Sequence, residues 1–241
     1  MVCWDNMKNC ATGAIESSQL NWILLEERFR EALMAGDIAA ALAVSATLTS
    51  AEQLGAFHRY VIQPALYDIG EAWAQGRISV TQEHRASAIV GRVISSLNER
   101  FIRPTLSKGR AIVTTLAYER HELGAWVLAD MLEHDGWGVH YLGANATETT
   151  IFNALLRFKP HLLALSITMY LSVEFARQII SRIRESEIIM PPAVLVGGFA
   201  VNSRPAIWKE IGAHGYAEDV EKALIFANSW WNKLPTEQRL K

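Results

Sequence analysis

A histidine and a carboxylate two residues apart form the group best suited to chemistry in this sequence. Glu119, His121 and Gly124 follow a short apolar run at residues 111–117 and open a segment with helical character. Neutral imidazole is the commonest protein ligand for a metal, and a carboxylate at its second nitrogen orients it and raises its basicity. The spacing therefore predicts that His121 ligates a metal and that Glu119 orients it.

Two further loops carry hydroxyl or glycine residues at the ends of apolar runs. Ser166 and Thr168 lie at the end of the run at 162–166, and Gly197 and Gly198 follow the run at 194–196. The carboxyl ends of parallel strands meet at one edge of an open α/β sheet, and ligands bind outside that edge. We therefore expect the three loops to line one ligand site.

Helical periodicity dominates the first half of the chain. Apolar positions recur at three- and four-residue intervals from Leu20 to about Phe101. This pattern predicts two helices up to about residue 48, a third over 51–74 with a kink at Pro64, and a fourth over 79–100. Together they predict a four-helix bundle over residues 18–104, after a flexible leader at 1–17.

The pattern changes in the second half, where short apolar runs alternate with helical segments. Strands are predicted at 111–116, 138–142, 162–166 and 194–196, with a weak fifth at 214–216. Such alternation is typical of a parallel sheet built from right-handed crossovers. The predicted fold class is α plus α/β: the helical bundle is followed by a Rossmann-like, five-stranded parallel domain over residues 108–235.

Composition narrows the class of protein. The chain has 241 residues, 50% of them hydrophobic, with a formal net charge of −2. This charge argues against direct nucleic-acid binding, which requires a basic surface. Two cysteines imply no disulfide framework, and no apolar run approaches the ~20 residues that span a bilayer. We expect a soluble, cytoplasmic protein without a membrane partner.

Taken together, the three loops resemble those of the cobalamin-binding domain. That family carries D-x-H-x-x-G, then S-x-L or S-x-T, then G-G, and the resemblance covers roughly residues 108–232. It implies that cobalamin is the cofactor and that His121 replaces the cofactor's own benzimidazole as the lower axial ligand of cobalt. Glu119, where the family more often has Asp, would hydrogen-bond the second nitrogen of this histidine. Gly124 would permit close packing beneath the corrin.

The same resemblance assigns roles to the other two loops. Ser166 and Thr168 would hydrogen-bond the buried benzimidazole and the loop around it. Gly197 and Gly198 would let the backbone approach the nucleotide tail, because no Cβ intrudes. Each pair by itself is also typical of an ordinary helix cap or turn. Their order along one sheet favours the ligand site.

A second motif lies in the helical half, which in this family covers the upper face of the corrin. Trp73, nine intervening residues, Glu83 and His84 resemble the W-x9-E-H spacing of CarH-type light-sensing cobalamin proteins and of free-standing AerR-type antirepressors. The resemblance implies that Trp73 packs over the upper ligand and that Glu83 hydrogen-bonds it. His84 would ligate cobalt once that ligand is lost, which makes a bis-histidine switch with His121. The alternative is that Trp73 is an ordinary bundle core residue and that Glu83 and His84 begin a solvated helix face.

CarH-type repressors carry a winged-helix DNA-binding module, and residues 1–18 are too few to form one. The sequence therefore predicts a light-responsive regulator, rather than an enzyme, that acts as an antirepressor through a partner transcription regulator. The rival interpretation is a corrinoid methyl-carrier protein of a methyltransferase system, in which a Trp and a His above cobalt would obstruct the partner enzymes. A cobalamin-storage protein is a third.

Several properties stay open at this level. The resting upper ligand is adenosyl, methyl or a hydroxo group, and the motifs do not distinguish these forms. The input is light, redox state or cofactor supply. The oligomeric state is also open, because bundle faces that dimerise look like faces that pack within one chain.

Overall fold

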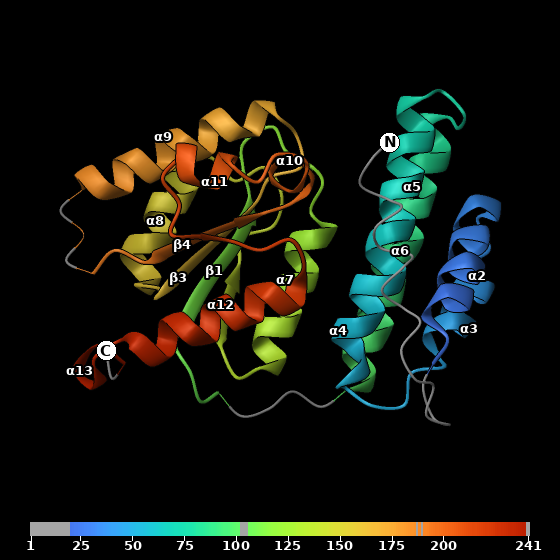
Figure 1. The fold of residues 1–241 in the computed structure, drawn as a ribbon, viewed down its shortest axis with the longest axis horizontal. Coiled ribbons are helices and arrows are strands. Elements are labelled where there is room, and N and C mark those ends of the chain that lie inside the picture. Colours follow the sequence, from blue (N-terminus) through green and yellow to red (C-terminus); the bar gives the residue numbers. More distant parts are fainter. Residues whose placement is uncertain (1–19, 102–105, 187, 189, 240–241) are drawn as a thin grey trace.

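The computed structural model of the protein describes residues 20–101, 106–186, 188 and 190–239. The leader expected at 1–17 lies outside the described residues. In the first part the chain forms only helices, as Figure 1 shows. They are α2 (Trp22–Ala35), α3 (Ile38–Ser45), α4 (Gln53–Phe57), the π-helical turn η1 (His58–Ile62), α5 (Gln63–Ala74) and α6 (Val80–Arg100).

Local sequence accounts for where these helices begin and end. Asn21 caps α2 through its side chain, and Gly36, at φ 69°, ends the helix in the left-handed conformation that glycine adopts most readily. Ser79 and Gln82 form a reciprocal capping box at the start of α6. The second helix ends at Ser45, three residues before the predicted end at 48.

The third predicted helix is interrupted by a π-helical turn rather than by the expected kink at Pro64. The segment runs from Gln53 to Ala74, and a π-helical turn occupies His58–Ile62, directly before Pro64. Proline has no N–H and its ring crowds the preceding turn, and a wider turn relieves this conflict. The proline therefore stands near the start of a new α-helical segment.

The second part of the chain confirms the predicted parallel sheet. Five strands pair in the order β2-β1-β3-β4-β5, and every pairing is parallel. The strands are β1 (Arg110–Thr115), β2 (Gly138–Tyr141), β3 (Leu162–Ser166), β4 (Ala193–Gly197) and β5 (Gly215–Tyr216). The helices are α7 (Leu123–His134), α8 (Glu148–Phe158), α9 (Leu171–Glu185), α10 (Phe199–Ser203), α11 (Ile207–Glu210), α12 (Val220–Lys233) and α13 (Thr236–Arg239).

Helices cover both faces of the sheet. One face packs against α8, α9, α10 and α11, and the other packs against α7 and α12. Small residues such as Ala164 and Ala223 occur in the second layer. The strands are apolar on both faces, as a sheet with two buried faces requires.

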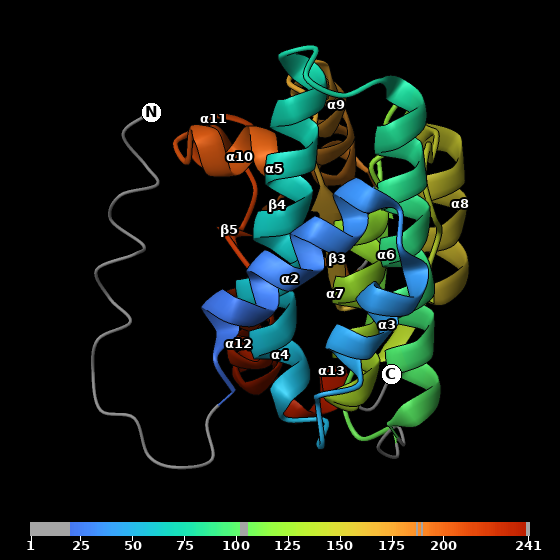
Figure 2. The ribbon, with the colours of Figure 1, turned by 90° about the vertical axis from the view of Figure 1, so that its right-hand side faces the viewer.

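The bundle packs beside the α/β part in Figure 1 and lies in front of it in the turned view of Figure 2. Val127 and Met131 on α7 belong to the same hydrophobic cluster as the bundle core. Polar contacts add to this interface, including the hydrogen bond from Asn98 Nδ2 to Asp130 Oδ2 at 2.5 Å. Within the described residues, no helix is both long and apolar enough to cross a membrane.

The strand order places the predicted loops at one edge. The chain passes from β1 to β2 toward one side of the sheet, and from β3 to β4 and β5 toward the other side. Such a topological switch point opens a crevice at the carboxyl ends of the strands. His121 and Thr168 lie in the two loops that flank this crevice.

Candidate functional site

A large cleft lies between the bundle and the carboxyl edge of the sheet. Its volume is about 2170 Å³, more than twice the ~300–1,000 Å³ of a pocket for a drug-sized ligand. Nine of the ten predicted site residues line it: Trp73, Glu83, His84, His121, Gly124, Ser166, Thr168, Gly197 and Gly198. The exception, Glu119, is fully buried next to His121. The prediction that the separate motifs share one site agrees with this arrangement.

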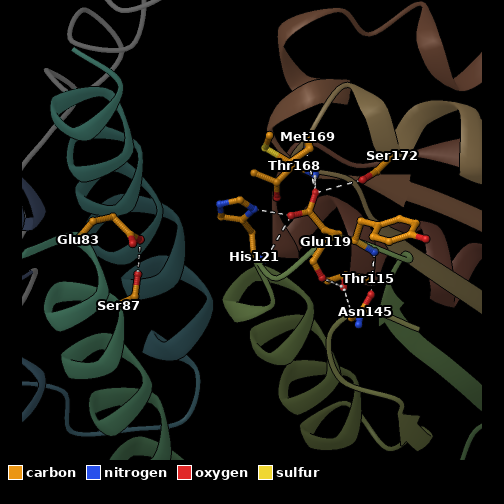
Figure 3. Close-up of polar contacts among 10 residues, drawn as sticks. Glu83, Ser87, Thr115, Glu119, His121, Asn145, Thr168, Met169 and Ser172 are labelled. Carbon is orange, nitrogen blue, oxygen red and sulfur yellow. Dashed lines mark hydrogen bonds and ion pairs between the residues drawn. The ribbon is translucent and has the colours of Figure 1, made fainter. Parts of the chain in front are cut away.

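Glu119 holds His121 by its ring and by its backbone. His121 Nδ1 forms a short hydrogen bond with Glu119 Oε1, and the His121 backbone N–H donates to the same oxygen at 3.2 Å. The histidine side chain is half exposed, and Figure 3 shows its ring pointing toward the bundle. With the proton on Nδ1 and donated to the carboxylate, Nε2 carries a lone pair available to a ligand in the cleft.

The electrostatics of the pair favour a proton on the His121 ring and a negative charge on Glu119. The hydrogen bond that the His121 ring donates to Glu119 raises the pKa of His121 above its ordinary value, against the opposing effect of burial, and the charge of Glu83 adds to the rise. Burial by itself raises the pKa of Glu119, but hydrogen bonds from His121 and Met169 outweigh it and lower that pKa overall. Glu119 is therefore a buried carboxylate that stays ionised.

The second oxygen of Glu119 joins two loops that are far apart in sequence. Oε2 accepts hydrogen bonds from the backbone N–H groups of Thr168 at 3.2 Å and Met169 at 2.7 Å. The Ser172 hydroxyl donates to it at 3.4 Å (Figure 3). Sequence reasoning missed Ser172, because nothing in the local pattern connects the start of α9 with a loop 53 residues earlier.

The two glycines at the end of β4, Gly197 and Gly198, lie so close to neighbouring backbone that a Cβ would clash with it. A Cβ at Gly197 would lie 2.8 Å from Ala217 O, and one at Gly198 would lie 2.6 Å from Ile167 O. Gly198 also has φ 95°, where side chains are strained. Close packing of the adjacent loops thus demands glycine here, which is a reason additional to the predicted approach of a ligand. At Gly124, a Cβ would make only an ordinary contact with Ser166 Oγ at 3.8 Å.

The cleft continues along one face of the sheet toward α12. Ala164, Ala217 and Ala223 line it there, beside Leu195. Their short side chains leave room between the sheet and the helix. Nothing in the sequence distinguishes these alanines, because alanine is common in any protein core. Only the packing of α12 over β3 and β4 places them at the cleft.

The bundle contributes the opposite wall. Trp73 is 48% exposed and lines the cleft, so the alternative that it is a core residue is wrong. Glu83 accepts a hydrogen bond from the Ser87 hydroxyl at 2.8 Å, and Figure 3 places both across the gap from His121. His84 Nε2 lies 3.7 Å from Glu83 Oε2, and its side chain is 75% exposed.

The donor set fits a metal that arrives in a macrocycle. Across the described residues, no three His, Cys, Asp or Glu side chains are grouped so that they could hold a metal ion. One oriented imidazole supplies a single ligand, which suits a metal whose equatorial positions are already filled. A wide cleft with one oriented imidazole on its sheet-side wall fits a corrin.

Comparison with known families identifies the ligand. A model described as B12 binding domain matches residues 109–225, and a second model with the same description matches residues 25–98. The chain belongs to the cobalamin-binding protein family. Cobalamin is its cofactor, and both the bundle and the α/β part match models of this family.

Relatives of two kinds are similar to this cobalamin-binding protein. HTH-type transcriptional repressor CarH of Myxococcus xanthus is 30% identical over 64% of this chain and 50% of its own length. The trimethylamine corrinoid protein of Methanosarcina barkeri is 26% identical over 65% of this chain and 73% of its own. The chain thus spans about half the length of CarH.

Solved structures confirm the fold. The monomethylamine corrinoid protein of Methanosarcina barkeri superposes with a TM-score of 0.71 at 17% identity, over 86% of this chain and 98% of that one. A helical part followed by a five-stranded parallel sheet is therefore the architecture of a known corrinoid protein.

Proposed function

We propose that this protein is a light-responsive cobalamin sensor that acts through a partner transcription regulator. The observation that carries the proposal is the pair of walls that face each other across the cleft. Glu119 and His121 lie on the sheet side, and Trp73 and Glu83 lie on the bundle side. A protein that only stores the cofactor needs the first wall and has no need of an aromatic residue and a carboxylate on the second.

On the sheet side, His121 would hold the cobalt of cobalamin from below. Its Nε2 would supply the lone pair, while Glu119 keeps the proton on Nδ1 and raises the basicity of the ring. Ser166 and Thr168 line the crevice beside it, and Ala164, Ala217 and Ala223 leave a channel for the nucleotide tail. These assignments agree with the fully buried position of Glu119, which keeps its charge away from water.

On the bundle side, Trp73 and Glu83 cover the upper ligand. Bound cobalamin supplies a cobalt–carbon bond that visible light can break. Trp73 provides an apolar surface for the upper group, and Glu83, held by Ser87, provides an acceptor for its hydroxyl or amine groups. His84 would ligate cobalt once the upper group is lost, and the large exposure of its side chain allows it to change rotamer.

The output is carried by another protein. CarH and a second relative, CarA of Myxococcus xanthus, are transcriptional repressors by name. The net charge of −2 does not provide the basic surface that DNA requires. A regulator that changes shape with its cofactor and binds a transcription factor fits both observations, and such a protein is not itself an enzyme.

The second candidate is a corrinoid methyl carrier. It is favoured by the likeness to the trimethylamine corrinoid protein of Methanosarcina barkeri, which the chain covers to 73% of its length. A carrier must present the upper face of the corrin to partner active sites. Trp73 and His84 on the bundle wall oppose this use.

The test is an absorption spectrum of the protein loaded in the dark with adenosyl-, methyl- or hydroxocobalamin, desalted, and recorded again after white light. The sensor predicts retained corrin bands that shift toward a bis-histidine form, on illumination for the adenosyl and methyl forms and by ligand exchange for the hydroxo form. His84→Ala should retain the cofactor and lose this shift. His121→Ala should weaken cofactor retention.

A matched control is His140→Ala, because His140 lies on β2 and stacks on Phe158, away from the cleft. It should behave like the parent protein. If the illuminated spectrum of His84→Ala equals that of the parent, the bis-histidine switch is wrong. Retained bands that respond only to methyl transfer by a partner enzyme would support the carrier.

A further inference from the structure

Two non-glycine residues beside the site, Tyr118 and Asn145, have left-handed backbone, and a hydrogen bond joins them. Tyr118 has φ 65° and Asn145 has φ 58°. The Tyr118 backbone N–H donates to Asn145 Oδ1 at 2.7 Å, across 27 residues of sequence. A bulky side chain rarely adopts positive φ, and such a conformation persists only where surrounding contacts hold it. The loop between β2 and α8 is thus hydrogen-bonded to the loop between β1 and α7 at Tyr118.

The backbone N–H of Asn145 makes further hydrogen bonds to the same loop. Its N–H lies 2.9 Å from Glu119 O and 3.0 Å from Thr115 Oγ1. The buried Thr115 hydroxyl in turn donates to Glu119 O at 2.9 Å. Figure 3 shows Thr115 and Asn145 below Glu119, on the far side from the bundle. Asn145 therefore contacts two successive residues, Tyr118 and Glu119, at the start of the histidine loop.

Packing does not supply the same constraint. The Tyr118 side chain is 83% exposed, and its ring makes a tilted contact with Phe175 at 5.7 Å between centroids. An exposed ring does little to hold strained backbone. Two hydrogen bonds hold this turn: the one from Tyr118 N–H to Asn145, and the one from Glu119 N–H to Leu116 O at 3.0 Å, which closes the turn within its own loop. Of the two, only the bond to Asn145 ties the turn to another loop, and this turn sets the direction in which Glu119 enters the protein interior.

We propose that Asn145 is a positioning residue for the axial histidine. By holding Tyr118 in the left-handed turn, its side-chain oxygen places the Glu119 carboxylate against the ring of His121. The inference rests on the proposed axial role of His121. All contacts on which the proposal rests lie within the protein chain, so the first test uses the apoprotein.

The residue type allows the two functions of Asn145 to be separated. Asparagine and aspartate tolerate the left-handed region and carry a side-chain oxygen, while glycine tolerates the region without any acceptor. Asn145→Asp keeps both properties, and Asn145→Gly keeps only the backbone conformation. Comparison of the two variants isolates the hydrogen bond to Tyr118.

The first readout is proton NMR of the apoprotein. The ring N–H of His121, bonded closely to Glu119, should give a far-downfield signal that disappears in Glu119→Gln. We expect Asn145→Asp to retain this signal and Asn145→Gly to lose or broaden it, with circular dichroism showing an intact fold. Should the glycine variant unfold, Asn145→Ser, whose hydroxyl is too short to reach Tyr118, carries the same expectation.

The second readout is the spectrum of the same proteins loaded with hydroxocobalamin. Asn145→Gly should lower the ratio of imidazole-ligated to unligated corrinoid about 10-fold, the lower end of the effect of losing a ligand's supporting contacts. A glycine variant with the parent's signal and the parent's ratio would overturn the positioning role. If instead the NMR signal follows the prediction but no variant, nor the parent, shows imidazole ligation, the axial role of His121 fails and the positioning of the loop stands.

Discussion

Glu119→Gln offers the sharpest test of the site, because it changes charge and proton direction with almost no change in shape. In the parent, Oε1 meets the His121 ring and Oε2 meets the N–H groups of Thr168 and Met169. A carboxylate accepts at both ends, whereas a glutamine amide accepts at one end and donates at the other. The substitution therefore forces one end into conflict.

Each orientation of the amide has a calculable cost. If its oxygen stays with Thr168 and Met169, its NH₂ faces His121 Nδ1, the ring proton moves to Nε2, and the lone pair on the cleft side is lost. If the amide is reversed, two backbone N–H groups lose their acceptor, at about 1–3 kcal/mol each when buried. Loss of the charged hydrogen bond costs about 1.5–3 kcal/mol, which corresponds to roughly 10–100-fold in affinity.

The assay is a spectral titration of apoprotein with hydroxocobalamin, which reports both the dissociation constant and the imidazole-ligated fraction. We expect Glu119→Gln to weaken axial ligation roughly 10–100-fold. Glu119→Asp should retain more ligation, since it keeps the charge. Glu122→Gln is the matched control, because Glu122 is in the same loop but accepts from the Tyr141 hydroxyl at 3.0 Å. Parent-like affinity and ligation in Glu119→Gln would refute the orienting role.

Three further predictions concern stability. Burial, and to a lesser extent the charge of His134, lowers the pKa of His58 to about 4. The stability that comes from keeping His58 neutral is therefore complete above pH 6.5, and about 3 kcal/mol of the free energy of unfolding is lost as the pH falls toward 4. Urea unfolding of His58→Leu should show a flatter pH profile than that of the parent. Arg59 Nε lies 3.3 Å from the buried Asp219 carboxylate, and Arg59→Met should lower the free energy of unfolding by about 1–3 kcal/mol, measured by urea; no change would show that the pair is dispensable. Gly198→Ala, with a Cβ 2.6 Å from a backbone oxygen, should lower it by about 1–3 kcal/mol in the same assay.

The predicted elements depended on local signals. Short apolar runs alternating with helical segments identified the strands, including a weak signal for the short Gly215–Tyr216, and the fourth helix begins at Val80, next to its predicted start. The second helix ends three residues early, and the turn before Pro64 also differed, because a proline can be accommodated by a kink or by a wider turn and packing within the bundle selects between them.

The sequence by itself determined the chemistry of the site. The residues with a metal-ligating imidazole and its carboxylate, Glu119 and His121, stand two positions apart, so their contact follows from one loop. The motif with Trp73 and Glu83 was likewise visible as spacing along a helical pattern. Short-range geometry is a property of the local chain and can be read from it.

Tertiary structure alone decided what holds that chemistry in place. Ser172 and Asn145 reach the histidine loop from 53 and 27 residues away, the first to Glu119 and the second to Tyr118. Those contacts exist because β1 lies between β2 and β3, an order that no local pattern specifies. Strand order depends on the packing of both faces of the sheet at once, and for that reason the positioning residues appeared only with the fold.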